Sequence, residues 1–223
     1  MLGTQLTGQV GSHLTQLSEH VYLHKQVVPA FNGLQSAAKK AGFNLQIASG
    51  FRSFERQLFI WNNKFSGKTT LLDKNENSLL TEQLSDIEKL WAILHWSALP
   101  GASRHHWGTD LDVYDPNLLP EGQDLRLNVS EYQNTGYFFE LNQWLSENIN
   151  TFDFYRPYQK YNGGVAIEPW HLSYRPIAQQ AIEQLTLPLI TQTIAKNNVC
   201  GKSLICEQLP IIYKQFICNV ERS

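Results

Sequence analysis

The chain has few cysteines, no marked excess of charge of either sign and no long apolar run. Its cysteines, Cys200, Cys206 and Cys218, are odd in number and irregularly spaced. This pattern argues against a disulfide framework and a zinc ribbon, and it predicts reduced thiols packed as small apolar side chains. The net charge of −2 and the pI near 6.4 come with no basic stripe, so we expect no nucleic-acid partner.

Targeting and membrane signals are also missing. Residues 1–9 have neither the positive region nor the apolar region of a secretory signal. No apolar run approaches the roughly 18 residues that a transmembrane helix needs. We therefore expect a cytoplasmic protein without a membrane span, or a periplasmic one if the sequence is a processed form. Nothing in the sequence indicates an oligomeric state.

The length of 223 residues and the 42% hydrophobic content are sufficient for a substantial core. We expect one domain over 1–223, with a motif-bearing core at about 25–186 and a C-terminal extension at 187–223. Apolar spacing predicts helices, which resume near 176 after those at 25–42, 53–65, 85–96 and 136–149. Apolar and polar alternation, or short apolar runs, predict strands at 44–48, 108–114, 152–156, 165–167 and 170–174.

These elements predict the fold class. Helices come early and late in the chain, short strands lie between them, and no βαβ rhythm is present. This order favours an α+β domain with a small, mainly antiparallel sheet flanked by helices. The polar segment 66–80 lacks periodicity and is expected to be a surface excursion that could close over a site.

The first chemical motif is segment 103–112, Ser-Arg-His-His-Trp-Gly-Thr-Asp-Leu-Asp. A histidine at a strand entry and a carboxylate within the strand can both reach one metal ion, as His105 and Asp112 would. His106 competes with His105 for this role. Asp110 competes with Asp112, because residues two apart on a strand share a face. Spacing alone leaves both choices open.

The second motif is Glu168-Pro169-Trp170-His171. Pro169 excludes an ordinary helix interior, so the motif is expected on a strand or turn. His171 is a candidate third ligand, and Glu168 is close enough in sequence to act on a metal-bound water without ligating the metal. Three protein ligands, an open position and a neighbouring base are the components of a catalytic zinc site.

The combination of motifs resembles the VanY-type D-alanyl-D-alanine carboxypeptidases, in the wider group that includes VanX dipeptidases and the hedgehog-like zinc fold. Their pattern S-x-H-x-x-G-x-A-x-D, followed later by E-x-W-H, is matched at Ser103, His105, Gly108, Asp112, Glu168, Trp170 and His171. Asp110 replaces the usual small residue. An upstream G-[FY]-R-S element is matched at residues 50–53, with Gln57 following. The matches span about 46–174.

The resemblance implies roles that spacing leaves open. It implies zinc as the cofactor, bound by His105, Asp112 and His171, with Glu168 as the catalytic base. It gives Arg52 a catalytic and substrate-binding role, since a guanidinium can hold a carboxylate or stabilise an oxyanion. Weaker substrate-binding candidates complete the site, namely Gln57, Ser103 and Trp170.

The implied activity is zinc-dependent removal of the terminal D-alanine from peptidoglycan stem peptides or muropeptides. The absence of a signal sequence favours an L,D-carboxypeptidase of peptidoglycan recycling, and a D,D-carboxypeptidase acting on D-Ala-D-Ala ends is the alternative. A catalytically inactive peptidoglycan-binding domain is the alternative of another class. A non-haem iron site is less favoured, because such sites usually show H-x-D/E on a jelly roll. A lysostaphin-like endopeptidase would need an H-x-H pair, which the chain lacks.

Overall fold

A four-stranded antiparallel sheet carries both chemical motifs. The computed structural model describes residues 1–221. The strands of the sheet lie in the order β3 (Gln46–Ser49), β6 (Asp110–Tyr114), β8 (His171–Tyr174) and β7 (Phe154–Tyr155). Two separate hairpins are formed by β1 (Leu14–Ser18) with β2 (Val21–His24) and by β4 (Leu71–Leu72) with β5 (Ser78–Leu79).

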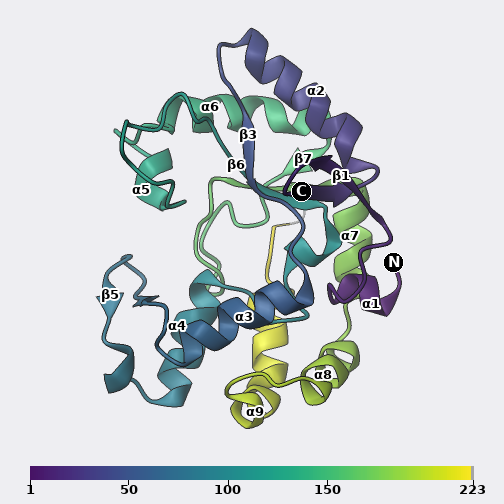
Figure 1. Cartoon of the computed structure of the whole chain (residues 1–223), viewed down its shortest axis with the longest axis vertical. Coiled ribbons are helices and arrows are strands. Elements are labelled where there is room, and N and C mark those ends of the chain that lie inside the picture. Colours follow the sequence, from purple (N-terminus) through teal and green to yellow (C-terminus); the bar gives the residue numbers. More distant parts are fainter. Residues whose placement is uncertain (222–223) are drawn as a thin grey trace.

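Helices lie on both sides of this sheet (Figure 1). One group comprises α2 (Val27–Lys40) and α6 (Phe139–Asn148), with the short α5 (Val129–Tyr132). The other comprises α3 (Phe54–Phe65), α4 (Asp86–Trp96), α7 (Arg175–Gln184), α8 (Leu187–Lys196) and α9 (Lys202–Ile212), with the short α1 (Gly3–Leu6). Single turns complete the chain: η1 (Thr81–Gln83), η2 (Arg104–Trp107), η3 (Ile149–Phe152) and the π-helical η4 (Tyr213–Ile217). The expected α+β class is confirmed.

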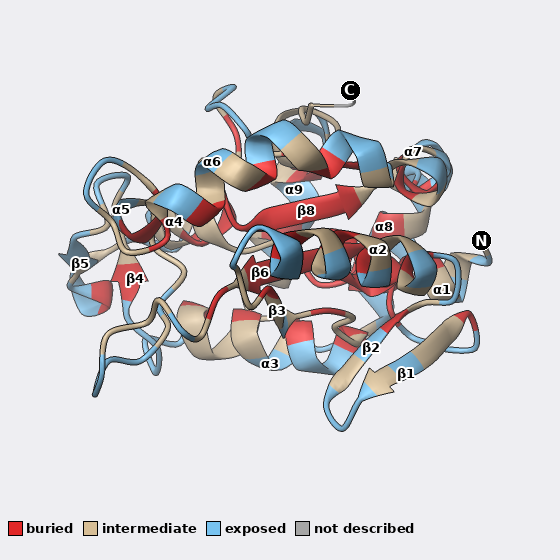
Figure 2. Ribbon diagram, turned by 90° about the horizontal axis from the view of Figure 1, so that it is seen from above, coloured by how far each residue is buried: buried red, intermediate tan, exposed pale blue. Residues whose placement is uncertain are grey.

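The alternation along β6 decides where the site forms. Leu111 and Val113 are fully buried in a hydrophobic cluster with α2 and α6. Because successive side chains of a strand point to opposite faces, Asp110 and Asp112 point to the other side of the sheet. Strands β6 and β8 are buried along most of their length (Figure 2). The polar face of the central strands is therefore enclosed between the sheet and the second group of helices.

The predicted helices correspond to α2, α3, α4 and α6, each starting or ending within a few residues of the expected bounds. The start of α3 is set by Ser53, whose hydroxyl accepts a hydrogen bond from the backbone N–H of Arg56 at 3.1 Å. The strand expected at 165–167 is wrong. The backbone N–H of Ala166 donates instead to the carbonyl of His95 on α4, at 2.9 Å, so this segment does not pair with the sheet.

Three regions have more order than the sequence indicates. The segment 66–80 contains the β4–β5 hairpin, and the hairpin of β1 and β2 near the N-terminus was not predicted. The C-terminal segment forms α8 and α9, which pack into the second hydrophobic cluster through buried isoleucines and leucines. No helix in residues 1–221 combines the length and the apolar character needed to cross a membrane.

The cysteines lie in this C-terminal segment and form no disulfide. Cys206 is exposed, and Cys200 and Cys218 are half-buried. The expectation of reduced thiols agrees with this arrangement. Cys200 packs against the hydrophobic cluster as expected, whereas the expectation of apolar packing is wrong for the exposed Cys206.

Candidate metal centre

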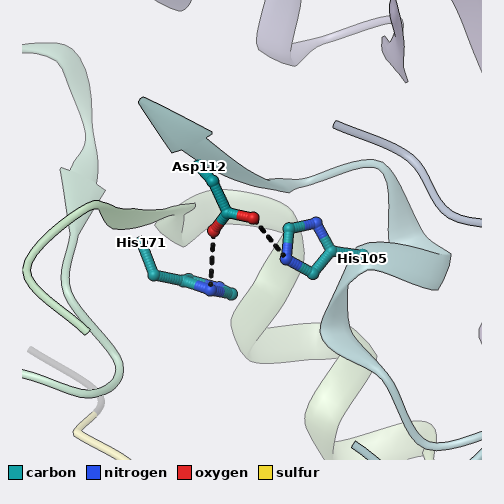
Figure 3. A group of neighbouring side chains, drawn as sticks. All are labelled: His105, Asp112 and His171. Carbon is teal, nitrogen blue, oxygen red and sulfur yellow. Dashed lines mark ion pairs between the residues drawn. The ribbon is translucent and has the colours of Figure 1, made fainter. Parts of the chain in front are cut away.

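Strand pairing brings three predicted ligands together. Asp112 on β6 lies directly opposite His171 on β8 in the antiparallel register, and opposed residues place their side chains on the same face. His105 comes from the η2 turn just before β6. Asp112 Oδ2 lies 3.4 Å from His105 Nε2, and Asp112 Oδ1 lies 3.3 Å from His171 Nδ1 (Figure 3).

Each histidine is oriented by a hydrogen bond from its outer ring nitrogen. His105 Nδ1 donates to the carbonyl oxygen of Gly50 at 2.8 Å. His171 Nε2 donates to Asp110 Oδ1 at 2.9 Å. Both acceptors are oxygens without a proton, so these two nitrogens carry the hydrogens. The other two nitrogens, Nε2 of His105 and Nδ1 of His171, therefore turn unprotonated lone pairs toward Asp112 when the rings are neutral.

The geometry fits a divalent metal such as zinc. One atom from each of the three side chains lies within 4.8 Å of the others. Two ligands bound tetrahedrally at ~2.0–2.2 Å lie roughly 3.3–3.6 Å apart, which matches both measured separations. Asp112 Oδ1 is buried and has no hydrogen-bond partner among residues 1–221. A buried carboxylate oxygen without a donor is costly, and a cation at this point would satisfy it.

The competing ligands are committed elsewhere. His106 Nδ1 donates to the backbone carbonyl of Arg52 at 2.6 Å, and its Nε2 accepts from the N–H of Gly101 at 3.1 Å. Asp110 accepts from His171 and from Arg104. Neither side chain has a ligand atom directed at the cluster. Within the described residues, His105, Asp112 and His171 form the one group with metal-binding geometry.

Glu168 lies beside this cluster without being part of it. It occupies the turn before β8, where the N–H of His171 donates to its carbonyl at 3.1 Å. Its carboxylate oxygen Oε2 is 3.1 Å from His171 Nδ1. Burial raises the pKa of the Glu168 carboxyl group. A carboxyl group in this position is suited to exchanging protons.

The cluster lines a cavity of about 330 Å³ that also receives the other predicted residues Arg52, Ser103 and Trp170. Arg52 donates to Gln57 Oε1 at 2.9 Å and to Ser49 Oγ at 3.2 Å. Gln57 is buried and outside the cavity lining, so it contacts the site through Arg52. Trp170 has one side on the cavity, but its ring packs on Tyr132 with centroids 5.5 Å apart.

Three cavity residues were missed by the sequence reasoning. Arg104 forms a buried ion pair with Asp110 at 2.7 Å behind His171. The ring of Tyr158 lies edge-on to His171, with centroids 5.0 Å apart. Lys64 lines the cavity from α3. Of these, only Lys64 had a usable signal, because it follows Gln57 by two helical turns and so shares its face.

Comparison with known proteins identifies the family. The sequence model of VanY, described as D-alanyl-D-alanine carboxypeptidase, matches residues 20–177. The chain belongs to the VanY family. The match covers well over half of the chain and includes every residue of the cluster. The resemblance inferred from the motifs is thereby confirmed at the level of the family.

Relatives include a Haemophilus influenzae protein of uncharacterized function, 42% identical over 121 residues, which span 53% of this chain and 92% of that protein. A D-alanyl-D-alanine carboxypeptidase of Enterococcus faecalis is 27% identical over 172 residues, 76% of this chain. That alignment covers 54% of the Enterococcus protein, so the chain spans about half the length of this relative.

Solved structures share the fold. VanYB in complex with D-alanine-D-alanine is 25% identical with a TM-score of 0.55, covering 79% of this chain and 85% of that one. A variant of the vancomycin resistance D,D-pentapeptidase VanY in complex with Zn(II) is 27% identical with a TM-score of 0.53 and the same coverage. The LD-carboxypeptidase LdcB is 24% identical with a TM-score of 0.55, covering 81% and 77% of the two chains, and supports the fold alone.

Proposed function

We propose that this VanY-family chain is a zinc-dependent carboxypeptidase that removes a terminal D-alanine from peptidoglycan stem peptides. The observation that carries the proposal is the placement of Glu168 beside His105, Asp112 and His171 in a single cavity. Family membership supports the reaction class, and the complexes of VanY relatives with D-alanine-D-alanine and with Zn(II) support the ligand and the metal.

In this proposal His105, Asp112 and His171 hold the zinc ion. Zinc bound there would lower the pKa of a bound water toward ~7 and polarise the scissile carbonyl. Glu168 accepts a proton from the attacking water while the water oxygen bonds to the carbonyl carbon. When the C–N bond breaks, Glu168 delivers that proton to the leaving amine of D-alanine. The Arg52 guanidinium stabilises the negative charge that develops on the carbonyl oxygen.

Hydrogen bonds within the site hold the side chains in the positions that these roles need. Arg52 is held from two sides by Gln57 and Ser49, and Gln57 donates in turn to the carbonyl of Ala98 at 2.7 Å. Gln57 therefore acts as a positioning residue. Ser103 and Trp170 are proposed to contact the substrate from the cavity wall. The L,D-specificity expected from the sequence stays a prediction, and D,D-cleavage is its alternative.

The test is mass spectrometry of products from zinc-loaded protein incubated with a free tetrapeptide stem and a free pentapeptide stem, side by side. Loss of D-alanine from the tetrapeptide alone identifies an L,D-carboxypeptidase. Loss of only the last residue of the pentapeptide identifies a D,D-carboxypeptidase. Cleavage of neither peptide by protein with zinc confirmed in place would contradict the proposal and favour a peptidoglycan-binding domain.

Two variants separate the metal from the base. Glu168→Gln should retain one zinc ion per chain and lose turnover by at least about a hundredfold, the scale of general-base catalysis. His171→Ala should lose the zinc itself, because it removes a ligand. Metal content is measured by atomic emission alongside the product assay. Substantial turnover by Glu168→Gln would refute its assignment as the base.

A further inference from the structure

Two cationic side chains line the cavity without an anionic partner. Lys64 Nζ donates to Ser97 Oγ at 2.6 Å, and Arg52 donates only to the neutral oxygens of Gln57 and Ser49. None of the ion pairs among residues 1–221 involves either of them. A lysine ammonium has three N–H donors, so the contact with Ser97 leaves two donors of Lys64 for a ligand.

The remaining charges of the cavity are balanced or exposed. Arg104 is neutralised by Asp110, and at the outer part of the cavity the exposed Arg126 and the half-buried Glu76 carry opposite charges. A zinc ion with its charge of +2 would be offset by Asp112 and Glu168. The two positive charges of Arg52 and Lys64 are then left over. Because enclosing an unpaired cation is costly, the cavity is built for a ligand that brings negative charge.

The two cations differ in their relation to the reacting atoms. Burial lowers the pKa of Arg52, and the negative charges of Asp112 and Glu168 both oppose that effect. Burial also lowers the pKa of Lys64, where Glu168 opposes the effect and Asp112 does not contribute. The backbone N–H of Arg52 donates to the carbonyl of the metal-ligand candidate His105 at 3.1 Å, whereas Lys64 lies in the last turn of α3 and is held by Ser97 at the end of α4. This order matches a peptide whose scissile carbonyl is at the metal and whose terminal carboxylate is one residue away.

We propose that Lys64, held by Ser97, binds the C-terminal carboxylate of the substrate and so determines that this chain cleaves at a free peptide end. The inference rests on the proposed carboxypeptidase function and adds to it a specificity-determining residue. Arg52 is left free to act on the carbonyl oxygen. The ligand class is a peptide with a free terminal carboxylate, and a peptide with a terminal amide lacks the group that Lys64 binds.

The experiment measures binding without turnover. Zinc-loaded Glu168→Gln protein is titrated by calorimetry with a stem pentapeptide as the free acid and as the C-terminal amide. We expect the acid to bind roughly tenfold to a hundredfold more tightly, the scale of a charge-assisted hydrogen bond. Adding Lys64→Met should reduce this ratio of affinities to near one, because the free-acid peptide should bind more weakly while the affinity for the amide peptide stays unchanged. Adding Lys64→Arg should retain part of the preference.

Matched control variants test whether the preference for the free acid depends on Lys64 itself. Lys68→Met removes an exposed lysine four residues farther along the chain and outside the cavity lining, so it should leave the acid-to-amide ratio intact. Arg52→Gln should weaken the binding of both peptides and leave the ratio of their affinities unchanged. The proposal is overturned if the ratio survives Lys64→Met in folded, zinc-loaded protein, if it collapses in Arg52→Gln instead, or if acid and amide bind equally from the start.

The proposed function is tested separately by product analysis with wild-type protein. If no stem peptide is cleaved but the acid-to-amide ratio still depends on Lys64, the carboxylate site stands and the carboxypeptidase function fails. If D-alanine is released but the ratio does not depend on Lys64, the function stands and this inference fails. The two failures are therefore distinguishable.

Discussion

The Nε2–H of His171 donates to Asp110 Oδ1 over 2.9 Å, on the side of the ring away from Asp112. This contact is the arrangement in which a carboxylate orients a metal-binding histidine and increases its basicity. Burial alone would raise the pKa of Asp110, but the charge of Arg104 and the hydrogen bond from His171 lower it well below its usual value. The carboxylate is therefore ionised at neutral pH. In the motif pattern that the sequence resembles, this position usually holds a small residue.

The first prediction concerns this carboxylate. Asp110→Asn should weaken zinc binding roughly tenfold to a hundredfold, the range found when partners of metal ligands are removed. The physical reason is that a neutral amide accepts a weaker hydrogen bond from the Nε2–H of His171 than a carboxylate does. The ring is then oriented less firmly, and its Nδ1 is a less basic ligand. Competition with a chromogenic chelator measures the affinity. Asp124→Asn, at an exposed position, is the control and should bind zinc as the wild type does; equal affinity for both variants would contradict the prediction.

The second prediction concerns Arg104, which also donates to Tyr155 Oη at 2.8 Å and to Ser173 Oγ at 2.7 Å. Arg104→Met should destabilise the fold by about 3–5 kcal/mol, because it leaves the buried charge of Asp110 unpaired. The double variant with Asp110→Asn should lose less than the sum of the two single losses. Urea unfolding of the four proteins gives the coupling energy. Strict additivity would show that the two side chains do not act as a pair.

The sequence was sufficient for the metal cluster but not for its surroundings. The motifs together with the family resemblance named His105, Asp112 and His171, whereas spacing alone left His106 and Asp110 as competing ligands. Strand alternation places Asp110 and Asp112 on one face and cannot separate their roles. That separation comes from Arg104, whose contacts join residues up to 69 positions apart. The strand expected at 165–167 failed for the same reason, since a long-range contact with α4 replaced sheet pairing.

The third prediction concerns pH. His13 is 8% exposed, and burial, followed by the charge of His24, lowers its pKa to about 4. The unfolded chain has an ordinary histidine pKa near 6.5, so between about pH 6.5 and 4 the unfolded state takes up a proton that the folded state does not. Stability therefore falls as the pH falls through this window. His13→Phe should reduce this slope by up to ~1.4 kcal/mol per pH unit.

The slope is measured from urea unfolding at several pH values in the same buffer series. His20→Phe is the matched control, because the His20 side chain is 86% exposed and its replacement should leave the slope as in the wild type. A slope that stays unchanged in His13→Phe would mean that His13 takes up its proton in the folded protein as readily as in the unfolded chain.

The fourth prediction concerns the C-terminal segment, which the sequence analysis places in the same domain as the motifs. Ile205 on α9 is fully buried in the cluster that also contains Trp61 of α3, and Trp61 Nε1 donates to the carbonyl of Cys200 at 3.0 Å. Ile205→Ala should destabilise the protein by about 2–5 kcal/mol, because it leaves a cavity in this cluster.

The matched control is Ile211→Ala, because Ile211 lies on the same helix and is 51% exposed. This substitution should cost less than about 0.5 kcal/mol. If α9 belongs to the domain, the loss at Ile205 appears as an earlier midpoint of a single unfolding transition monitored by tryptophan fluorescence. A separate early transition that leaves zinc bound would show instead that the C-terminal helices unfold independently of the site.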